Sequence, residues 1–329
     1  MTRYEATKQY SHIRGFNYQP SYAMNSYEAW RFFDEETWRT ELGRGKKYFP
    51  NMNTVRLWMS YDAFRYEEKR QAENFEKALA IADSYGLKVM PVLFNRWHDK
   101  IMDNGGIYFN QMVPGSCWCA EEWIFDSYLK AFVEDHAQDP RILLWDICNE
   151  PFSYGKNQEF VDFIRPYELA WLERMYERIK KVDQLHPVGI SHSTVIPEVL
   201  EEIAHISDVF LIHPYYYYAP DAVYERPFEG FIDMVHQLVE VAEKHGKPVL
   251  TTETCWGSLD DDTRALVLKN TLEAHRECGL GIICHALHYS LVADLHDPED
   301  GLVHSPGNLC FIRKDGSLRK GHEIFNDYE

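Results

Sequence analysis

Short apolar runs alternate with amphipathic segments along most of the chain. The runs are rich in branched side chains and stop at Gly, Pro or polar residues, which is typical of strands buried on both faces. Between them, apolar residues recur three and four positions apart, and this spacing predicts helices. The expected strands are residues 15–18, 54–58, 88–94, 141–150, 187–192, 208–215, 248–253 and 281–288.

The helical pattern is strongest at residues 231–242, and Gly246 follows this segment as a stop signal. Gly86 is the corresponding stop signal after residues 75–85, because glycine readily adopts the left-handed conformation that ends a helix. In the first long helical segment, Trp30, Phe33 and Trp38 are candidate core contacts. The other expected helices cover residues 26–48, 121–136, 169–183, 197–205, 263–278 and 320–327.

Strands that alternate with helices pair in parallel through right-handed crossovers. Eight such units predict a (β/α)8 barrel that occupies residues 1–329 as a single domain, with function at the carboxyl ends of its strands. An open doubly wound sheet is the alternative. That fold would bind a phosphate group at a Gly-rich first turn, and no such turn is visible. Long loops are expected after the third strand, at residues 95–120, and after the eighth, at residues 294–308.

Composition and charge exclude several partners. The net charge of -18 argues against a nucleic acid or an anionic membrane as partner. No run is apolar and long enough to span a bilayer. The N-terminus has no signal-peptide pattern, and seven cysteines without regular spacing indicate reduced thiols, so a cytoplasmic location is expected. Cys117 and Cys119 have no second pair at zinc-finger spacing.

Two glutamates carry the candidate chemistry. Glu150 stands at the end of the buried run of residues 141–150, before Pro151, and Glu253 ends the run of residues 248–253 in the same way. A carboxyl group at a buried strand end loses hydration, which favours its protonated form, whereas a neighbouring cation favours the ionised form. Two carboxyl groups about 5 Å apart provide the nucleophile and the acid/base of retaining glycoside hydrolysis.

Other polar residues fall at the same ends of successive expected strands. Independent placement would scatter them, so their convergence favours a functional site over ordinary surface and core contacts. These residues are Arg56, His98, Asn149, His192, His213, Tyr215, His285 and His288.

In this order along the chain, Arg56, Asn149-Glu150-Pro151, His213-Pro214-Tyr215 and Glu253 resemble glycoside hydrolase family 5 and, more broadly, the clan A retaining glycosidases. The resemblance implies an eightfold barrel with Glu150 as acid/base and Glu253 as nucleophile. It also implies that Asn149 binds the hydroxyl next to the reacting carbon, that Arg56 and Tyr215 hold Glu253 ionised, and that His213 lines the site. His98 is a weaker match after the third strand.

The sequence departs from the family at the eighth strand, where the family usually has a tryptophan under the sugar and this chain has His285. Trp256 is then a candidate for the missing ring. Trp97, Tyr108 and Trp118 of the first long loop are further candidates for the cleft wall. No metal or other cofactor is expected, and the expected partner is a carbohydrate.

Three alternatives remain open from the residues alone. The strand-end histidines, His98, His192, His213, His285 and His288, fit a metal-dependent barrel hydrolase or isomerase. A sugar-binding barrel without catalysis is the second. The third concerns the glycosidase itself: exo-action on short substrates such as β-mannosides or β-glucosides is favoured, and endo-cleavage of a glucan or mannan polymer competes with it.

Overall fold

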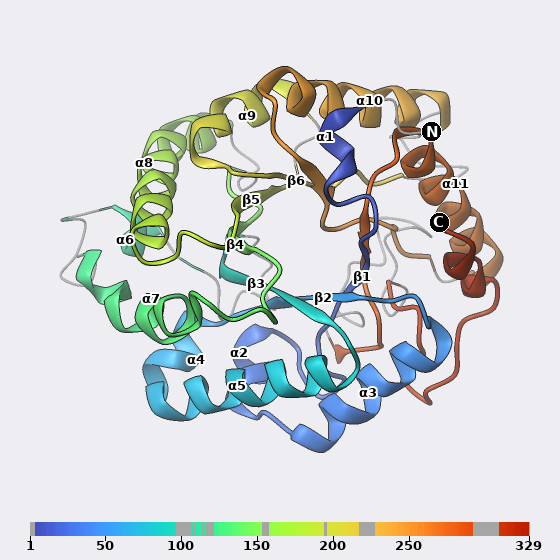
Figure 1. Cartoon of the computed structure of the whole chain (residues 1–329), viewed down its shortest axis with the longest axis horizontal. Coiled ribbons are helices and arrows are strands. Elements are labelled where there is room, and N and C mark those ends of the chain that lie inside the picture. The colour runs from blue at the N-terminus through green and yellow to red at the C-terminus, as the bar shows by residue number, and fades with distance from the viewer. Residues whose placement is uncertain are drawn as a thin grey trace.

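The eight apolar runs pair in chain order and close into a parallel barrel (Figure 1), as predicted. The computed structural model describes residues 4–96, 107, 109–113, 115, 122–152, 158–193, 196–216, 228–258, 260–291 and 309–328. The barrel closes where β1 pairs with β8. The strands are β1 (Arg14–Asn17), β2 (Thr54–Trp58), β3 (Lys88–Asn95), β4 (Trp145–Asn149), β5 (Val188–His192), β6 (Phe210–Ile212), β7 (Val249–Thr251) and β8 (Ile282–Cys284).

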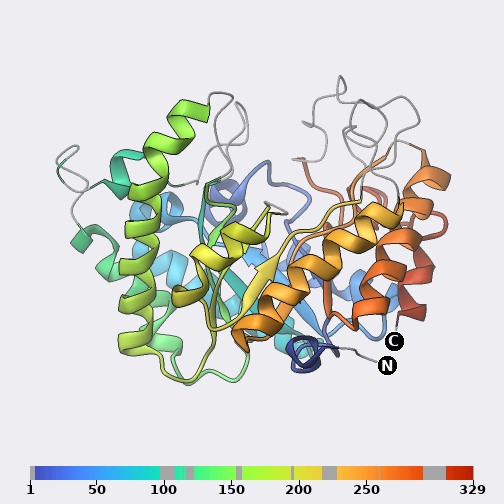
Figure 2. The same ribbon diagram turned by 90° about the horizontal axis from the view of Figure 1, so that it is seen from above.

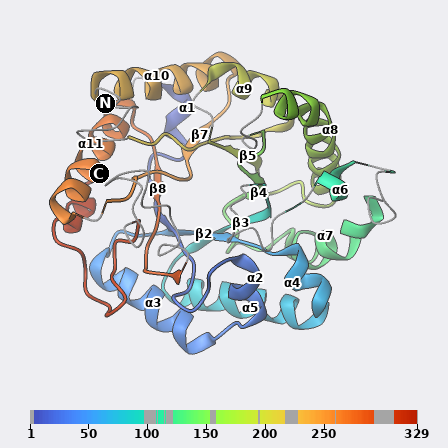
Figure 3. The same cartoon turned by 180° about the vertical axis from the view of Figure 1, so that it is seen from behind.

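Helices surround the barrel on all sides, as the two opposite views along its axis show (Figures 1 and 3). The α-helices are α1 (Glu5–Lys8), α2 (Ser26–Arg31), α3 (Glu35–Tyr48), α4 (Tyr61–Tyr66), α5 (Glu68–Ser84), α6 (Phe109–Met112), α7 (Asp126–Phe132), α8 (Gln158–Val182), α9 (Pro197–Glu202), α10 (Phe228–His245) and α11 (Asp261–Cys278). Short 3-10 helices are η1 (Glu122–Phe125), η2 (Glu134–His136), η3 (Ala204–Ile206) and η6 (His322–Asp327). None of the helices in the described ranges combines the length and the apolarity needed to cross a bilayer.

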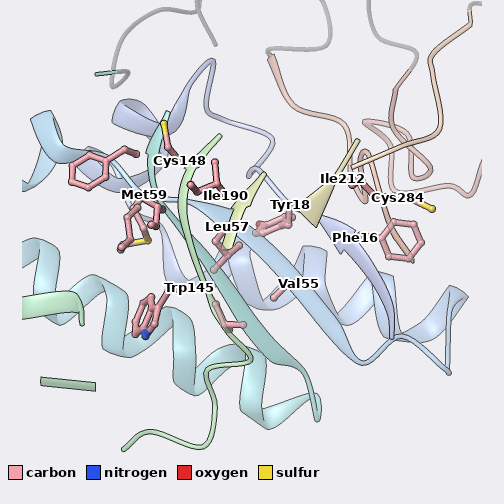
Figure 4. Packing of buried hydrophobic residues seen from close by; sticks show 14 of the residues in the cluster. Phe16, Tyr18, Val55, Leu57, Met59, Trp145, Cys148, Ile190, Ile212 and Cys284 are labelled. Atoms are coloured by element: carbon pink, nitrogen blue, oxygen red, sulfur yellow. The ribbon is translucent and has the colours of Figure 1, made fainter. Parts of the chain in front are cut away.

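The barrel wall separates two apolar cores, because successive side chains of a strand point to opposite faces. The larger core lies between the strands and the helices and includes Val55 and Leu57 of β2 (Figure 4). The smaller core includes Met90, Leu211, Leu250 and Ile283. On β2 the residue between the two core positions is Arg56, whose side chain therefore enters the barrel interior.

Two predicted helices are divided in the structure. The single helix expected at residues 26–48 is two helices, because Asp34 accepts a hydrogen bond from the backbone N–H of Thr37 and starts α3 anew. The segment 121–136 folds as η1, α7 and η2, and the expected C-terminal helix is the 3-10 helix η6. Tighter 3-10 turns commonly replace the ends of short helices.

The last three strands are shorter than predicted. Residues 213–215, 252–253 and 285–288 lie beyond β6, β7 and β8, where no regular ladder continues. Single backbone bonds still reach past the strand ends, from His213 N to the oxygen of His192 (3.0 Å) and from His285 N to the oxygen of Thr254 (2.9 Å). The candidate site residues of these three segments, His213, Tyr215, Glu253 and His285, thus lie at the rim of the barrel, beyond the ends of its strands.

The C-terminal segment lies at the amino ends of the strands, opposite the candidate site residues. The guanidinium of Arg14, at the start of β1, donates a 2.7 Å bond to the backbone oxygen of Tyr328. The end of the described chain, at Tyr328, therefore lies at the amino ends of the strands, and α1 lies at the same end in the side view (Figure 2). The predicted loops that follow β3 and β8 fall largely outside the described residues, and α6 lies within the first of them.

Buried His275 makes the stability of the barrel depend on pH. Burial lowers the pKa of His275 to about 4, and its neutral ring bonds the backbone oxygen of Thr271 and the hydroxyl of Thr251 on β7. Because the unfolded chain binds this proton near pH 6.5, the contribution is present above that pH and is lost as the pH falls towards 4. We expect the free energy of unfolding to drop by about 2 to 3 kcal/mol from this group alone.

Urea unfolding of wild type and His275→Gln between pH 7 and pH 4.5 measures this contribution, because the glutamine variant should show a shallower fall with acidification. The exposed His12→Gln substitution is the control and should keep the wild-type slope. Equal slopes for wild type and His275→Gln would contradict the assignment.

Candidate active site

Polar side chains from the ends of five strands meet at the carboxyl end of the barrel. Arg56 belongs to β2, Asn149 ends β4 and Glu150 follows it. His213 and Tyr215 follow β6, Glu253 follows β7 and His285 follows β8, so residues far apart in the chain surround one space. All of them except His285 are buried. The structure thus brings these seven predicted residues together, whereas His192 and His288, which were also expected there, have other neighbours. Trp97, His98, Tyr108 and Trp118 lie outside the described residues.

Glu253 is held as an anion. Its Oε2 accepts a 2.9 Å hydrogen bond from Nη1 of Arg56, and its Oε1 accepts a 2.6 Å bond from the hydroxyl of Tyr215. Burial by itself raises the pKa of Glu253. The charges of His213, His285 and Arg56 and the bond from Tyr215 outweigh burial and lower that pKa to about 2. The carboxylate is consequently ionised and fixed in orientation at neutral pH.

Arg56 is fully buried and joins five side chains of the barrel interior. Besides Glu253, it donates to Asn17 Oδ1 (2.8 Å), Asp146 Oδ2 (3.0 Å), Asn149 Oδ1 (2.7 Å) and Ser191 Oγ (2.8 Å). A buried guanidinium needs such partners, since leaving its charge unpaired away from water is costly. Its position, and with it that of Glu253, is therefore determined by β1, β4 and β5 together.

The register of β4 explains how two of these partners reach Arg56. Strict alternation along a strand would place Asp146 and Asn149 on opposite faces. The pairing of β4 with β5 shifts between these two residues, which is the effect of a bulge, and both side chains face Arg56. Asn149 also donates to Asn95 Oδ1 at 3.0 Å, so its side chain is held from both sides.

Glu150 has a different environment from Glu253. Its Oε1 lies 2.7 Å from Nδ1 of His213, whose Nε2 lies 3.1 Å from the hydroxyl of Thr252. The hydrogen bond between Glu150 and His213 can form with the proton on either atom, so protonated Glu150 can still bond His213. Glu150 also has a positive φ of 51°, which is uncommon for a residue other than glycine and marks a turn held by its surroundings.

The two glutamates are close enough to act on one bond. An oxygen of Glu150, an oxygen of Glu253 and a ring nitrogen of His213 all lie within 4.8 Å of one another. Carboxyl groups about 5 Å apart suit double displacement, whereas inverting enzymes keep them roughly 6.5 to 9.5 Å apart to admit a water. The spacing matches the retaining geometry that the sequence predicted.

The same three residues are one of two groups among the described residues that could hold a metal ion. In the first group, Arg56 already places a positive charge 2.9 Å from the Glu253 oxygen, which opposes a cation there. The second group is Glu76, His136 and Asp139, and Arg141 pairs with both of its carboxylates. Neither group contains two histidines.

Among the strand-end histidines that the structure describes, His213 and His285 lie near Glu253, whereas His192 and His288 have other neighbours. His288 lies apart from the glutamates, with its Nε2 3.1 Å from Nη1 of Arg44. The ring of His192 lies beside Phe152, with the ring centres 6.0 Å apart. Of the histidines in the described ranges, His213 is the one within 4.8 Å of both glutamates, so the arrangement favours acid/base chemistry over a polyhistidine metal centre.

Aromatic rings border the site. Trp256, half-buried, meets Tyr215 edge to face with ring centres 4.8 Å apart. His285 meets Trp58 in the same manner at 5.6 Å, and Trp58 lies over the guanidinium of Arg56 at 5.1 Å. Trp58 is the last residue of β2 and lies on the same strand face as Arg56. This alternation could have identified Trp58 from the sequence, but the prediction of site residues did not include it.

Sequence reasoning also missed polar residues inside the barrel. Asp146 lies within the run predicted as an apolar strand. A charged residue in such a buried run requires a partner of opposite charge in the interior, and this partner is Arg56. Asn17 and Ser191 gave no such signal, because small polar residues occur in many strand ends. They could be assigned only once Arg56 was placed.

No protein-family model matches the chain. A probable mannan endo-1,4-beta-mannosidase F of Aspergillus flavus is 24% identical over 126 residues, which is 36% of this chain and 24% of that protein. This chain thus covers about a quarter of the length of that curated relative.

Solved structures match over nearly the whole chain. Exo-beta-1,4-mannosidase Op5Man5 from Opitutaceae bacterium strain TAV5 has a TM-score of 0.70 at 17% identity, over 95% of this chain and 58% of that chain. GH5_18 from Streptomyces cattleya, solved with GlcNAc, has a TM-score of 0.67 at 16% identity, over 96% and 80%. The chain therefore resembles glycoside hydrolase family 5, and the predicted barrel fold is confirmed.

Proposed function

We propose that the protein is a β-glycoside hydrolase that acts by double displacement, with Glu253 as nucleophile and Glu150 as acid/base. The proposal depends on one observation above all. Two buried carboxyl groups lie within 4.8 Å of each other, and the described contacts differ between them: the guanidinium of Arg56 bonds Glu253, and the imidazole of His213 bonds Glu150. Their environments therefore separate the two roles, since one group must be ionised while the other holds a proton.

In the first step, the ionised oxygen of Glu253 attacks the anomeric carbon while Glu150 gives its proton to the glycosidic oxygen that leaves. Arg56 and Tyr215 keep Glu253 aimed before the attack, so no reorientation is needed at the moment of reaction. Asn149, held by Arg56 and Asn95, presents its amide to the hydroxyl next to the reacting carbon.

In the second step, Glu150 takes a proton from a water molecule, and the water oxygen attacks the anomeric carbon as the bond to Glu253 breaks. The imidazole of His213, 2.7 Å from Glu150, can share the proton during this exchange. Two inversions at the same carbon leave the product with the configuration of the substrate.

We propose short β-mannosides as the substrates, with β-glucosides as the second choice, and exo-action on them. The relatives include proteins named as an endo-mannosidase and an exo-mannosidase, which supports the mannoside class and leaves the two modes of action to experiment. We expect His285 to take the place of the family's tryptophan and Trp58, whose ring centre lies 5.6 Å from that of His285, to provide an aromatic face for a sugar.

A panel of 4-nitrophenyl β-glycosides and of β-1,4-manno-oligosaccharides tests the proposal. Wild type should release nitrophenol from the β-mannoside and shorten the oligosaccharides by one sugar at a time, with the β-anomer as the first product by NMR. Glu150→Gln and Glu253→Gln serve as inactive controls. An α-anomer as first product would contradict double displacement, internal cleavage of long chains would establish endo-action, and no hydrolysis of any member would contradict the function.

A further inference from the structure

A buried ion pair supports the turn that carries Glu150. Arg96, just after β3, and Glu168 on α8 are 6% and 2% exposed, and Nε of Arg96 lies 2.5 Å from Oε1 of Glu168. The other oxygen of Glu168 accepts a 3.2 Å hydrogen bond from the backbone N–H of Phe152, two residues after Glu150. The pair therefore connects α8 directly to this turn.

The turn needs such support. Glu150 and Phe152 both have left-handed backbone conformations, with φ of 51° and 65°, and neither residue is a glycine. Side chains with a Cβ are strained there, so the conformation persists only where neighbouring groups hold it. The backbone N–H of Glu150 donates to the oxygen of Ser191 at 2.9 Å, and Glu168 holds the far side of the turn at Phe152.

Arg96, which follows β3, also forms hydrogen bonds that hold the same turn. Its backbone N–H donates to the oxygen of Asn149 at 2.9 Å, and its Nη1 donates to the oxygen of Ile107 at 3.2 Å. On the outer side, the guanidinium of Arg165 lies 4.6 Å from the centre of the Phe152 ring. Asn149, before Glu150, and Phe152, two residues after it, are thus bound to the two members of one ion pair.

A purely structural role would not explain this arrangement well. Buried ion pairs contribute little net stability, because removing two charges from water offsets their attraction. Here one carboxylate oxygen of Glu168 accepts a hydrogen bond from a backbone N–H of the turn that carries Glu150.

We propose that the Arg96–Glu168 pair is a positioning device for Glu150. It holds the turn in its left-handed conformation, and so keeps the Glu150 carboxyl against His213 and within reach of the bond opposite Glu253. The expected effect on hydrolysis rests on the proposed function, whereas the effect of the pair on the position of the Glu150 side chain does not.

Glu168→Gln tests the pair. Glutamine offers one acceptor oxygen in place of two, so it cannot accept from both Arg96 and Phe152, and a donor must face a donor at one of the contacts. We expect kcat/KM for a β-mannoside with a poor sugar or alkyl leaving group to fall roughly 10- to 100-fold, since that reaction needs the proton from Glu150. For the 2,4-dinitrophenyl glycoside, whose leaving group needs no proton, the first step should change less than about 3-fold.

Asp183→Asn is the matched control. Asp183 is a buried carboxylate just beyond the other end of α8, where it bonds Trp145 and His186 far from the rim. This variant should lose stability without any dependence on the leaving group. An equal loss on both substrates in Glu168→Gln, or no loss on either, would overturn the positioning role.

A structural readout keeps the proposal testable whatever the enzyme hydrolyses. In a crystal structure of Glu168→Gln, Glu150 should leave the 2.7 Å bond to His213 that it makes in the native chain. If glutamine prevents folding, the double variant Arg96→Met/Glu168→Met removes both charges together and should fold while showing the same displacement. Glu150 unmoved in the variant structure would refute the device, whereas a wild type inactive on every glycoside would refute only the proposed function.

Discussion

Glu253→Gly is expected to lower the rate of β-glycoside hydrolysis by roughly 10⁴-fold or more, equivalent to about 5 kcal/mol of transition-state stabilisation. The substitution removes the attacking oxygen and leaves a space beside Arg56 and Tyr215, both of which still point into it. Azide fits such a space and carries the negative charge that Arg56 binds. Because it attacks from the face that Glu253 occupied, added azide should restore turnover and give the α-glycosyl azide.

The identity of that azide product decides the assignment. NMR of the product separates the two anomers, and circular dichroism of the variant shows whether the barrel is intact. Wild type with azide is the control and should form no α-azide. Formation of the β-azide by Glu253→Gly, or retention of substantial hydrolysis, would mean that Glu253 is not the nucleophile.

Glu150→Ala is expected to show a loss that depends on the leaving group. Hydrolysis of substrates with alkyl or sugar leaving groups should fall by roughly 10³-fold, because the departing oxygen receives no proton. With a 2,4-dinitrophenyl glycoside the first step remains fast, and the second becomes limiting because no base activates water. A burst of dinitrophenol equal to the enzyme concentration should therefore appear, followed by slow turnover.

Azide again provides the stereochemical check. In Glu150→Ala it attacks the glycosyl–Glu253 intermediate from the side that Glu150 vacates, so it should speed the second step and yield the β-glycosyl azide. Stopped-flow absorbance and mass spectrometry of the intact protein measure the burst and the covalent intermediate. If the two glutamates held the opposite roles, the α- and β-azide products of the two variants would be exchanged.

The contrast between the two environments explains why these variants should differ. Glu253 has a guanidinium and a phenol on its two oxygens, and its pKa is lowered to about 2. Glu150 contacts an imidazole, which can accept or donate a proton at the same atom. Both groups lie in a space from which protein atoms exclude much of the water, and there such differences in charge act strongly.

The shortening of the last strands shows where prediction from the sequence was accurate and where it was not. The apolar run before Glu253 located β7, because burial on both faces is visible as a run of branched residues. Its end could not be located, since a strand ends where its neighbours stop pairing, and those neighbours are tens of residues away in the chain. Glu253 therefore lies on the rim, held by Arg56 and Tyr215, beyond the strand that was predicted to reach residue 253.

Local patterns of burial and of turn residues were sufficient to predict the eight strands, their parallel order and the two glutamates near strand ends. The contact of both Asp146 and Asn149 with Arg56 could not be predicted in this way, because it depends on a register shift between β4 and β5 in the folded barrel. Likewise, only folding brings Glu168 to the turn that follows Glu150. These contacts join residues from different strands and helices, and such pairings arise from closure of the barrel, which no local spacing encodes.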